Sequence, residues 1–416
     1  MWFKTLDILG KKLIPIVQGG MGVGVSAHRL AGAVARENGV GTIASVDLRH
    51  HHPDLAEQTE HCHDRDKIDQ ANLIALDREI KAAKQLAQGH GAIAVNIMKA
   101  VRQHPALVQQ ACESGADVLV MGAGLPLDLP EMVADFPKMG LIPILSESRG
   151  VAIVMKKWLK KGRCPDAIVI EHPGYAGGHL GANKVADLHA PRFEFDVVLN
   201  DCQALFTELG LGEDAPPLIL AGGIDSHEKV RHWLGAGAGA VQLGTAFAVT
   251  QDGDAHDEFK RVLINATPSN MVEFISVAGL PARAVATNWL KQYQRHEPRM
   301  QACARADPRR CAQQMDCLTQ CGLRDGLAKI GQFCIDLKLV SALKGDVQKG
   351  LFFRGAGTLP FGKAVRSVRE LIEYLLYGTF PAALDVTTTH FKTMPAIADR
   401  NTVVQRGAQV LAQAAS

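Results

Sequence analysis

The feature that most constrains the fold is a regular alternation of short apolar runs with longer amphipathic segments between residues 13 and 265. Apolar runs bounded by turn residues are typical of strands buried on both faces, and amphipathic segments between them are typical of crossover helices. Eight such runs predict strands at residues 13–18, 41–46, 92–97, 118–121, 142–145, 167–170, 218–221 and 240–243. The intervening segments predict helices at residues 27–37, 70–87, 105–114, 130–139, 151–161, 194–209 and 226–234.

Eight strand and helix units favour a closed α/β structure, a (β/α)8 TIM barrel, over an open sheet. The 416 residues exceed what one barrel needs, so we expect an accessory part. The predicted domains are a barrel over residues 1–265, a mainly helical, cysteine-containing extension over 266–385 and a C-terminal tail over 386–416. Within the extension, helical periodicity covers residues 326–344 and 363–377, which we expect to flank the rim of the barrel.

Charge and hydropathy exclude several classes of partner. Lys and Arg number 45 against 43 Asp and Glu, so the chain has no broad positive field for nucleic acid. The N-terminus lacks the apolar segment of a signal peptide, and no stretch is long enough to span a membrane, which predicts a cytoplasmic protein. We expect a small-molecule substrate. A homodimer stays open, because the sequence does not report the oligomeric state.

Glycine-rich segments follow most of the predicted strands, at the end of the barrel where TIM-barrel active sites lie. Residues 221–223 (Ala-Gly-Gly) follow the seventh strand, and residues 242–245 (Gln-Leu-Gly-Thr) close the eighth. Loops at these two positions often bind phosphate through main-chain amides, and glycine lets the main chain approach the ligand closely. The pair therefore predicts a phosphate site, although barrel-closing turns are the simpler interpretation of each segment alone.

These segments resemble the nitronate monooxygenases, formerly called 2-nitropropane dioxygenases, and the related flavin-dependent enoyl-ACP reductases. The resemblance covers roughly residues 10–290, and a weaker resemblance occurs at residues 350–353. Its motifs lie at residues 15–22, 41–43, 95–96, 174–181, 221–224 and 242–245. It implies FMN as cofactor and a flavin oxidoreductase as the activity. The cofactor-binding residues that it implies are Gln18, Gly20, Met21, Gly22, Asn96, Gly177, Gly178, Ala221, Gly222, Gly223, Gln242, Gly244 and Thr245.

The resemblance places the catalytic role on His179, which ends the Ala-Gly-Gly-His motif at residues 176–179. Imidazole transfers protons near neutral pH, and removal of an α-proton from a nitroalkane gives a nitronate that can reduce flavin. We therefore expect oxidation of small nitronates or nitroalkanes with His179 as acid/base. Tyr175 stands where the family often has Glu, which weakens the assignment of a substrate.

Two other functions remain open at this point. The same histidine can serve an NAD(P)H-dependent flavin reductase of enoyl thioesters or quinones, with NAD(P)H as cosubstrate and an iron–sulfur cluster as a further electron carrier. The third alternative is a non-catalytic flavin-binding sensor. The histidine does not choose between the two reactions, because in an enoyl reductase the same imidazole could guide a proton or polarise a thioester carbonyl.

Five of the nine cysteines crowd between Cys303 and Cys334, after the predicted barrel. In a cytosolic chain this density indicates metal or redox chemistry rather than disulfides. The segment with Cys311, Cys317, Cys321 and Cys334 is somewhat similar to the cluster-binding segment of other iron–sulfur flavoproteins, although its spacing differs. An iron–sulfur cluster, a zinc ion and simple helix packing are the alternatives.

Residues 46–70 form a long polar segment after the second predicted strand, which we interpret as a solvated loop that can act as a lid. The loop is rich in histidine but lacks the spacing of a recognised zinc motif. A metal site is therefore disfavoured for the residues in question, namely His50, His51, His52, His61, Cys62 and His63.

Overall fold

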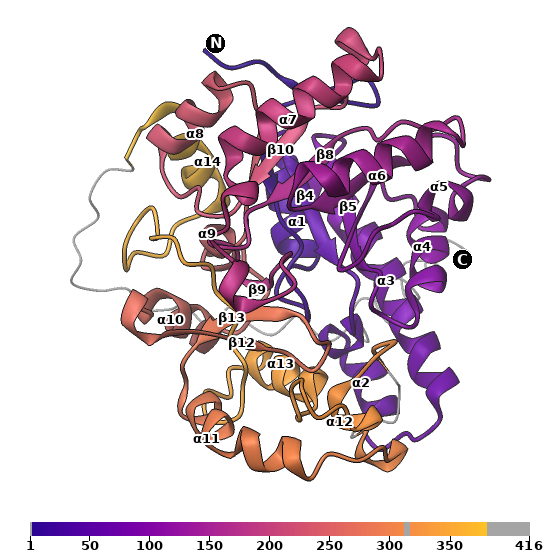
Figure 1. Cartoon of the computed structure of the whole chain (residues 1–416), viewed down its shortest axis with the longest axis vertical. Coiled ribbons are helices and arrows are strands. Elements are labelled where there is room, and N and C mark those ends of the chain that lie inside the picture. The colour runs from indigo at the N-terminus through magenta and orange to yellow at the C-terminus, as the bar shows by residue number, and fades with distance from the viewer. Residues whose placement is uncertain (1, 312–316, 381–416) are drawn as a thin grey trace, which may run out of the picture. The chain divides into compact units, whose positions relative to one another are not determined.

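The computed structural model describes residues 2–311 and 317–380, and residues 1–379 group into one compact unit. The predicted TIM barrel is confirmed: eight parallel strands close in the order β10-β11-β3-β4-β5-β6-β7-β8 (Figure 1). The barrel strands are β3 (Ile16–Gln18), β4 (Val40–Ala44), β5 (Ala92–Met98), β6 (Val118–Gly122), β7 (Gly140–Leu145), β8 (Ile168–Glu171), β10 (Leu218–Ala221) and β11 (Ala240–Leu243). The predicted tail at 386–416 lies outside the described residues.

Helices follow the barrel strands where the amphipathic segments predict them. They are α1 (His28–Arg36), α3 (Arg65–Ala87), α4 (His104–Glu113), α5 (Leu129–Met132), α6 (Ser148–Leu159), α7 (Phe195–Glu208) and α8 (His227–Gly235). Only α5 is much shorter than expected, because the chain after Met132 forms turns up to β7. Short helices after β11 are α9 (Thr245–Ala248) and α10 (Asp257–Asn265).

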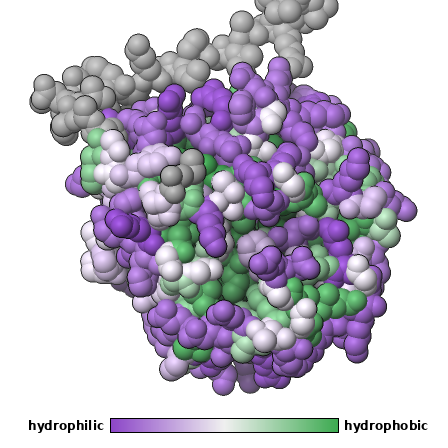
Figure 2. Space-filling model, turned by 90° about the horizontal axis from the view of Figure 1, so that it is seen from above, coloured by the Kyte–Doolittle hydropathy of each residue, from purple (hydrophilic) through white to green (hydrophobic). Residues whose placement is uncertain are grey.

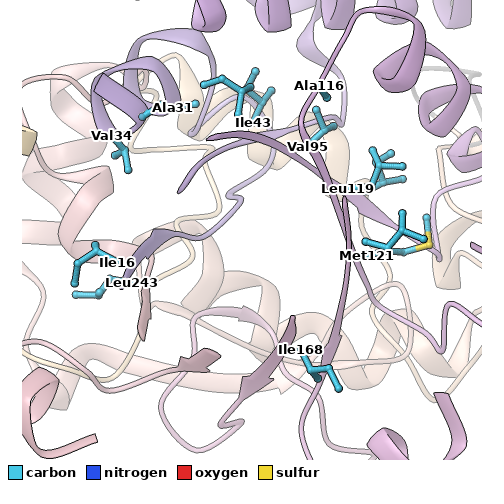
Figure 3. Close-up of a cluster of buried hydrophobic side chains, with 14 of the residues drawn as sticks. Ile16, Ala31, Val34, Ile43, Val95, Ala116, Leu119, Met121, Ile168 and Leu243 are labelled. Atoms are coloured by element: carbon cyan, nitrogen blue, oxygen red, sulfur yellow. The ribbon is translucent and has the colours of Figure 1, made fainter. Parts of the chain in front are cut away.

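The hydrophobic core has two layers, as a barrel requires. The outer layer lies between strands and helices; Figure 3 shows Ile43, Val95 and Leu119 from the strands with Ala31 and Val34 from α1. The inner layer fills the barrel with small and branched side chains. The N-terminal hairpin of β1 (Leu6–Ile8) and β2 (Lys11–Leu13) packs on this inner layer at the amino ends of the strands.

The C-terminal helix α14 (Val368–Tyr377) completes the helical ring rather than flanking the rim. It packs between α8 and α1, and its apolar residues, such as Leu371 and Leu375, belong to the strand–helix core. The indole of Trp2 donates to the carbonyl of Leu376 at 2.7 Å. The expectation that residues 363–377 flank the active-site rim was therefore wrong, because amphipathic periodicity shows that a helix has a buried face but not which neighbour covers it.

The extension contains helices, as expected, but also a sheet that the helical prediction missed. Strands β12 (Met271–Ile275) and β13 (Pro281–Val285) form an antiparallel hairpin, and β9 (Gly178–His179) from the barrel adds a third strand. The helices are α11 (Asn288–Ala302), α12 (Gly322–Asp325) and α13 (Ile335–Leu343). The predicted helix at 326–344 begins only at Ile335, because Gly326 ends α12 in the left-handed region at φ 67°.

The predicted solvated loop at 46–70 is largely helical. It holds the 3-10 helix η1 (Leu48–His51), α2 (Pro53–Thr59) and the start of α3. Asp47 and Arg49 are buried and form an ion pair, so the first part of the segment is core rather than lid. The other 3-10 helices are η2 (Val185–Asp187), η3 (Pro191–Phe193), η4 (Gly212–Asp214), η5 (Pro268–Asn270) and η6 (Pro308–Arg310).

The face of the molecule shown in Figure 2 is mostly hydrophilic. Figure 2 shows one face on which hydrophobic residues are exposed mainly in a hollow near its centre. Across residues 2–311 and 317–380, no helix combines the length and the apolar character needed to cross a bilayer. The homodimer and the cytoplasmic location stay predictions.

Candidate active site

A cavity of about 550 Å³ opens at the carboxyl ends of the barrel strands. This volume lies within the range of about 300–1,000 Å³ that is usual for small-molecule sites. Every predicted cofactor-binding residue except Gln18 lines it, and so does His179. The structure thus brings together residues that the sequence distributes over five strand ends.

The first glycine-rich loop forms one wall of the cavity through its main chain. A Cβ atom at Gly20 would lie only 2.4 Å from the Cβ of Asn96, so this position has no room for a side chain. The amide of Met21 donates to the hydroxyl of Ser26 at 2.9 Å, and the amide of Ser26 donates to the carbonyl of Met21 at 3.0 Å. These two bonds hold the loop closed beside Asn96.

The predicted phosphate loops after β10 and β11 both line the cavity. Gly222 and Gly223 have φ angles of 106° and 72°, a region that only glycine adopts easily. A Cβ at Gly223 would also lie 3.0 Å from the Cβ of Tyr175. In the second loop, the hydroxyl of Thr245 accepts a hydrogen bond from the amide of Gly355 at 3.1 Å. The C-terminal segment therefore packs directly on the loop after β11.

Two cations that sequence reasoning missed lie beside these loops. Lys229 donates to the carbonyl of Gly223 at 2.8 Å and pairs with Asp225 at 2.7 Å. Arg354 lines the cavity, is buried, and donates to the carbonyls of Leu263 and Gly355 at 2.9 and 2.8 Å. Arg354 directly follows residues 350–353, and the weaker resemblance of these residues to the family was the signal that could have pointed to it.

Gln18 is the predicted residue that the cavity lining does not include. Its side chain is fully buried, and its Oε1 accepts a hydrogen bond from the amide of Thr42 at 2.8 Å. Because Thr42 lies in β4, this bond ties neighbouring strands together. A structural role for Gln18 follows from these contacts, and direct contact with a cofactor stays a prediction.

His179 is held in the cavity by the extension. It lies in β9, where it pairs with Ala282 of β13, and its ring centroid lies 5.7 Å from that of Phe353. Its Nε2 is buried and has no hydrogen-bond partner among the described residues. Burial lowers the pKa of His179 to about 4. The imidazole is therefore neutral at neutral pH and keeps a ring nitrogen available to a ligand.

Arg283 fixes the loop that leads to His179. Its guanidinium is buried, donates to the carbonyls of Pro173 (3.3 Å) and Ala176, and forms an ion pair with Glu273. Since Arg283 belongs to β13, the same strand that pairs with β9 also anchors the start of the motif. The position of the predicted catalytic residue thus depends on the extension as much as on the barrel.

Glu171 is a second titratable group in the cavity, which sequence reasoning left without a role. It ends β8, and burial raises the pKa of its carboxyl to about 7. A carboxyl with this pKa changes its charge near neutral pH and can exchange a proton there. The signal in the sequence was its place at a barrel strand end, where catalytic residues of TIM barrels are concentrated.

Tyr175 lines the cavity and packs against two histidines. Tyr175 is 42% exposed, and its ring lies 4.6 Å from that of His172 and 6.1 Å from that of His189. The Nε2 of His172 lies 3.7 Å from a carboxylate oxygen of Glu194. Tyr175 is placed to contact whatever enters the cavity beside Gly223.

Cys311, Cys317, Cys321 and Cys334 lie in the extension and do not line this cavity. Within residues 2–311 and 317–380, no group of three or more His, Cys, Asp or Glu side chains is arranged to hold a single metal ion.

The fold and the cavity define a TIM-barrel protein in which glycine-rich loops and the imidazole of His179 line one cavity at the carboxyl ends of the strands, where the active sites of TIM-barrel enzymes lie. The family model of nitronate monooxygenase matches residues 6–378. The chain therefore belongs to the nitronate monooxygenase family and is an oxidoreductase, and FMN is the cofactor typical of this family.

Individual relatives are consistent with this assignment. A Bacillus subtilis (strain 168) protein named "Probable nitronate monooxygenase" is 26% identical over 292 residues, which cover 68% of this chain and 79% of the relative. Among solved structures, FabK from Thermotoga maritima superposes with a TM-score of 0.58 at 21% identity, over 87% of this chain and 91% of its own. Nitroalkane oxidase from Streptomyces ansochromogenes superposes with a TM-score of 0.59 at 18% identity, over 87% and 94%. Both structures share the fold.

Proposed function

We propose that the protein is an FMN-dependent enzyme that oxidises small nitronates or nitroalkanes, with His179 as the acid/base residue. The observation that carries the proposal is the buried Nε2 of His179, which has no hydrogen-bond partner among the described residues and belongs to a side chain that lines the cavity. FMN, when bound, supplies the two-electron acceptor for the oxidation.

The residues present fit this cofactor. Amides of Gly222, Gly223, Gly244 and Thr245 would hold the phosphate, and Lys229 and Arg354 are the nearby cations that offset its charge. A Cβ at Gly244 would meet no atom closer than 3.5 Å, so this glycine leaves open space on its cavity side. The main chain at residues 20–22 and the amide of Asn96 would contact the ring system. The remaining proposed contacts are Gly177, Gly178, Ala221 and Gln242.

His179 acts on the substrate in this proposal. Because its imidazole is neutral at neutral pH, Nε2 can accept the proton that leaves the α-carbon of a nitroalkane. The pairing of β9 with β13 keeps the ring oriented toward the cavity, so the proton acceptor is in place before substrate binds. Phe353, whose ring centroid lies 5.7 Å from that of His179, gives the imidazole an apolar neighbour in the cavity.

The test combines spectra with one variant and its matched control. Anaerobic addition of a nitronate should bleach the flavin absorbance without NADH. His179→Ala should keep its yellow colour but lose about 10²–10⁴-fold in turnover, the range for a general acid or base. His90→Ala, at an exposed histidine that does not line the cavity, should match wild type.

Different results would redirect the assignment. Undiminished turnover in His179→Ala would remove this residue from the mechanism. Rapid bleaching by NADH or NADPH, with turnover of an enoyl thioester or a quinone and none of nitronates, would replace the proposed reaction with that of a flavin reductase. In that case NAD(P)H would be the cosubstrate.

A further inference from the structure

Helices α10 and α13 and the segment at residues 351–353 give the large cavity a hydrocarbon wall. Six of their residues line it, and all six have hydrocarbon side chains, namely Phe259, Leu263, Leu339, Ala342, Leu351 and Phe353. Charged residues of the same helices, such as Lys260 and Asp336, do not belong to the lining. Among the described residues that line the cavity, these two helices thus present hydrocarbon only.

This wall faces hydrocarbon side chains of the barrel rim. Val25, in the loop after β3, and Ala248, in α9, line the cavity and pack in one buried cluster with Phe259, Leu263 and Ala342. The cluster also contains Val285, so both helices lie beside β13 (Figure 1). We name as the apolar arm the part of the cavity that is lined by Val25, Ala248, Phe259, Leu263, Leu339 and Ala342.

The apolar arm lies beside the predicted catalytic residue. The ring centroid of Phe353 lies 5.7 Å from that of His179, and the ring centroid of its neighbour Phe352 lies 5.5 Å from that of Phe259. Two consecutive residues of one segment therefore connect His179 with the arm. Met21, in the first glycine-rich loop, packs on the same cluster and lines the cavity. A ligand that reacts at His179 can thus extend its remaining atoms into the arm.

Main-chain polar groups next to the arm are already paired. The carbonyl of Leu263 accepts a hydrogen bond from the guanidinium of Arg354 at 2.9 Å, and the amide of Leu351 donates to the carbonyl of Lys338 at 3.0 Å. Within α10 and α13, main-chain groups pair with one another. Water in such a space finds few partners, whereas hydrocarbon gains contacts there. The arm therefore suits a hydrocarbon chain better than a phosphate, a ribityl chain or water.

We propose that the apolar arm binds the hydrocarbon chain of the substrate, so that the enzyme prefers nitronates and nitroalkanes with a linear chain of several carbons. The reacting group in this inference rests on the proposed function, whereas the preference for a chain rests on the arm. Each methylene group that moves from water into apolar surroundings strengthens binding about fourfold. A carboxylate or hydroxyl at the far end of the chain should weaken binding, because the described wall of the arm cannot pair with it.

Leu339 is the residue best placed to test this preference. It is half-buried, lines the cavity and lies one turn before Ala342 on α13. Leu339→Gln keeps roughly the size of the side chain but puts an amide into the arm. Ala342→Val is a second variant, which narrows the arm without adding a polar group. Leu337→Gln is the matched control, because Leu337 lies on the same helix, is 38% exposed and does not line the cavity.

The experiment measures ligand binding to the flavin-loaded protein separately from turnover. The probes are linear carboxylates from butanoate to octanoate, because a carboxylate has the planar two-oxygen anion of a nitronate and does not reduce flavin. Their dissociation constants, measured from the change in flavin absorbance, should fall about fourfold per methylene, or about 10²-fold over the series. Leu339→Gln and Ala342→Val should reduce this ratio to about tenfold or less, and Leu337→Gln should keep it. The kcat/KM values of nitroalkanes should rise with chain length in the same way.

The outcomes separate the arm from the reaction. Carboxylates that bind more tightly with chain length, together with no turnover of any nitroalkane, would reject the proposed reaction and support the arm. Dissociation constants that do not depend on chain length in the wild type would overturn the inference. An unchanged ratio in both Leu339→Gln and Ala342→Val would also overturn it. So would loss of flavin from both variants while they stay folded by circular dichroism, because the arm would then hold the flavin ring.

Discussion

Replacement of Glu171 by Gln tests the electrostatics of the cavity. Burial raises the pKa of this carboxyl from its usual 4.5 to about 7, so the folded protein binds the proton more tightly than the unfolded chain does. The contribution of Glu171 to the free energy of unfolding is therefore most favourable below about pH 4.5. It falls as the pH rises between about 4.5 and 7, and it is constant above that range. Glutamine cannot ionise, so the variant escapes this loss.

The magnitude follows from the two pKa values. A tenfold change in proton affinity is worth about 1.4 kcal/mol, so a pKa of about 7 in place of 4.5 corresponds to ~3 kcal/mol. Glu171 lines a cavity that water can enter, which screens its charge, and we expect Glu171→Gln to gain about 1–2 kcal/mol at about pH 8.5. Near pH 4.5 the gain should shrink toward zero.

The assay is denaturant unfolding of the ligand-free protein at both pH values. Glu208→Gln serves as the control, because Glu208 is 68% exposed and should show no comparable pH-dependent gain. An equal change in unfolding free energy at both pH values for Glu171→Gln would refute the reasoning, since a packing effect is independent of pH and an ionisation effect is not.

Three further predictions concern flavin binding and turnover. Gly20→Ala should weaken flavin binding about tenfold or more, because the new Cβ would displace Asn96. Gly235→Ala is the control, since this glycine has open space around it, and equal flavin content in the two variants would contradict the prediction. Arg283→Met should keep flavin but lower kcat about tenfold as the loop before His179 loosens, and an unchanged kcat would separate the anchor from catalysis. The pH profile of turnover should have an inflection near 7 that Glu171→Gln removes; its persistence would assign the titration to another group.

The barrel could be predicted from the sequence because its signals are local. Each strand of a parallel barrel is buried on both faces, so it reads as a short apolar run wherever its neighbours lie. The same holds for the rim, since a glycine such as Gly222 or Gly223 reflects a backbone conformation that its own position requires. All eight predicted strands are present, and the predicted glycines line one cavity.

The extension was predicted less well, for a physical reason. The hairpin of β12 and β13 has turn signals around Gly279, with φ 76°, but its partner β9 lies far away along the chain. Local periodicity does not encode such a pairing. In the same way, α14 has the pattern of any amphipathic helix, and only the gap between α8 and α1 determines its place.

The sequence by itself determined the barrel, the order of its strands and the glycine-rich rim where a ligand can approach the main chain. The tertiary structure decided how His179 is held by β13 and which cations lie beside the predicted phosphate loops. It also decided that burial moves the pKa of Glu171 toward neutrality. These properties depend on the distance between residues remote in sequence and on the water that packing excludes, and neither quantity is a property of any single segment.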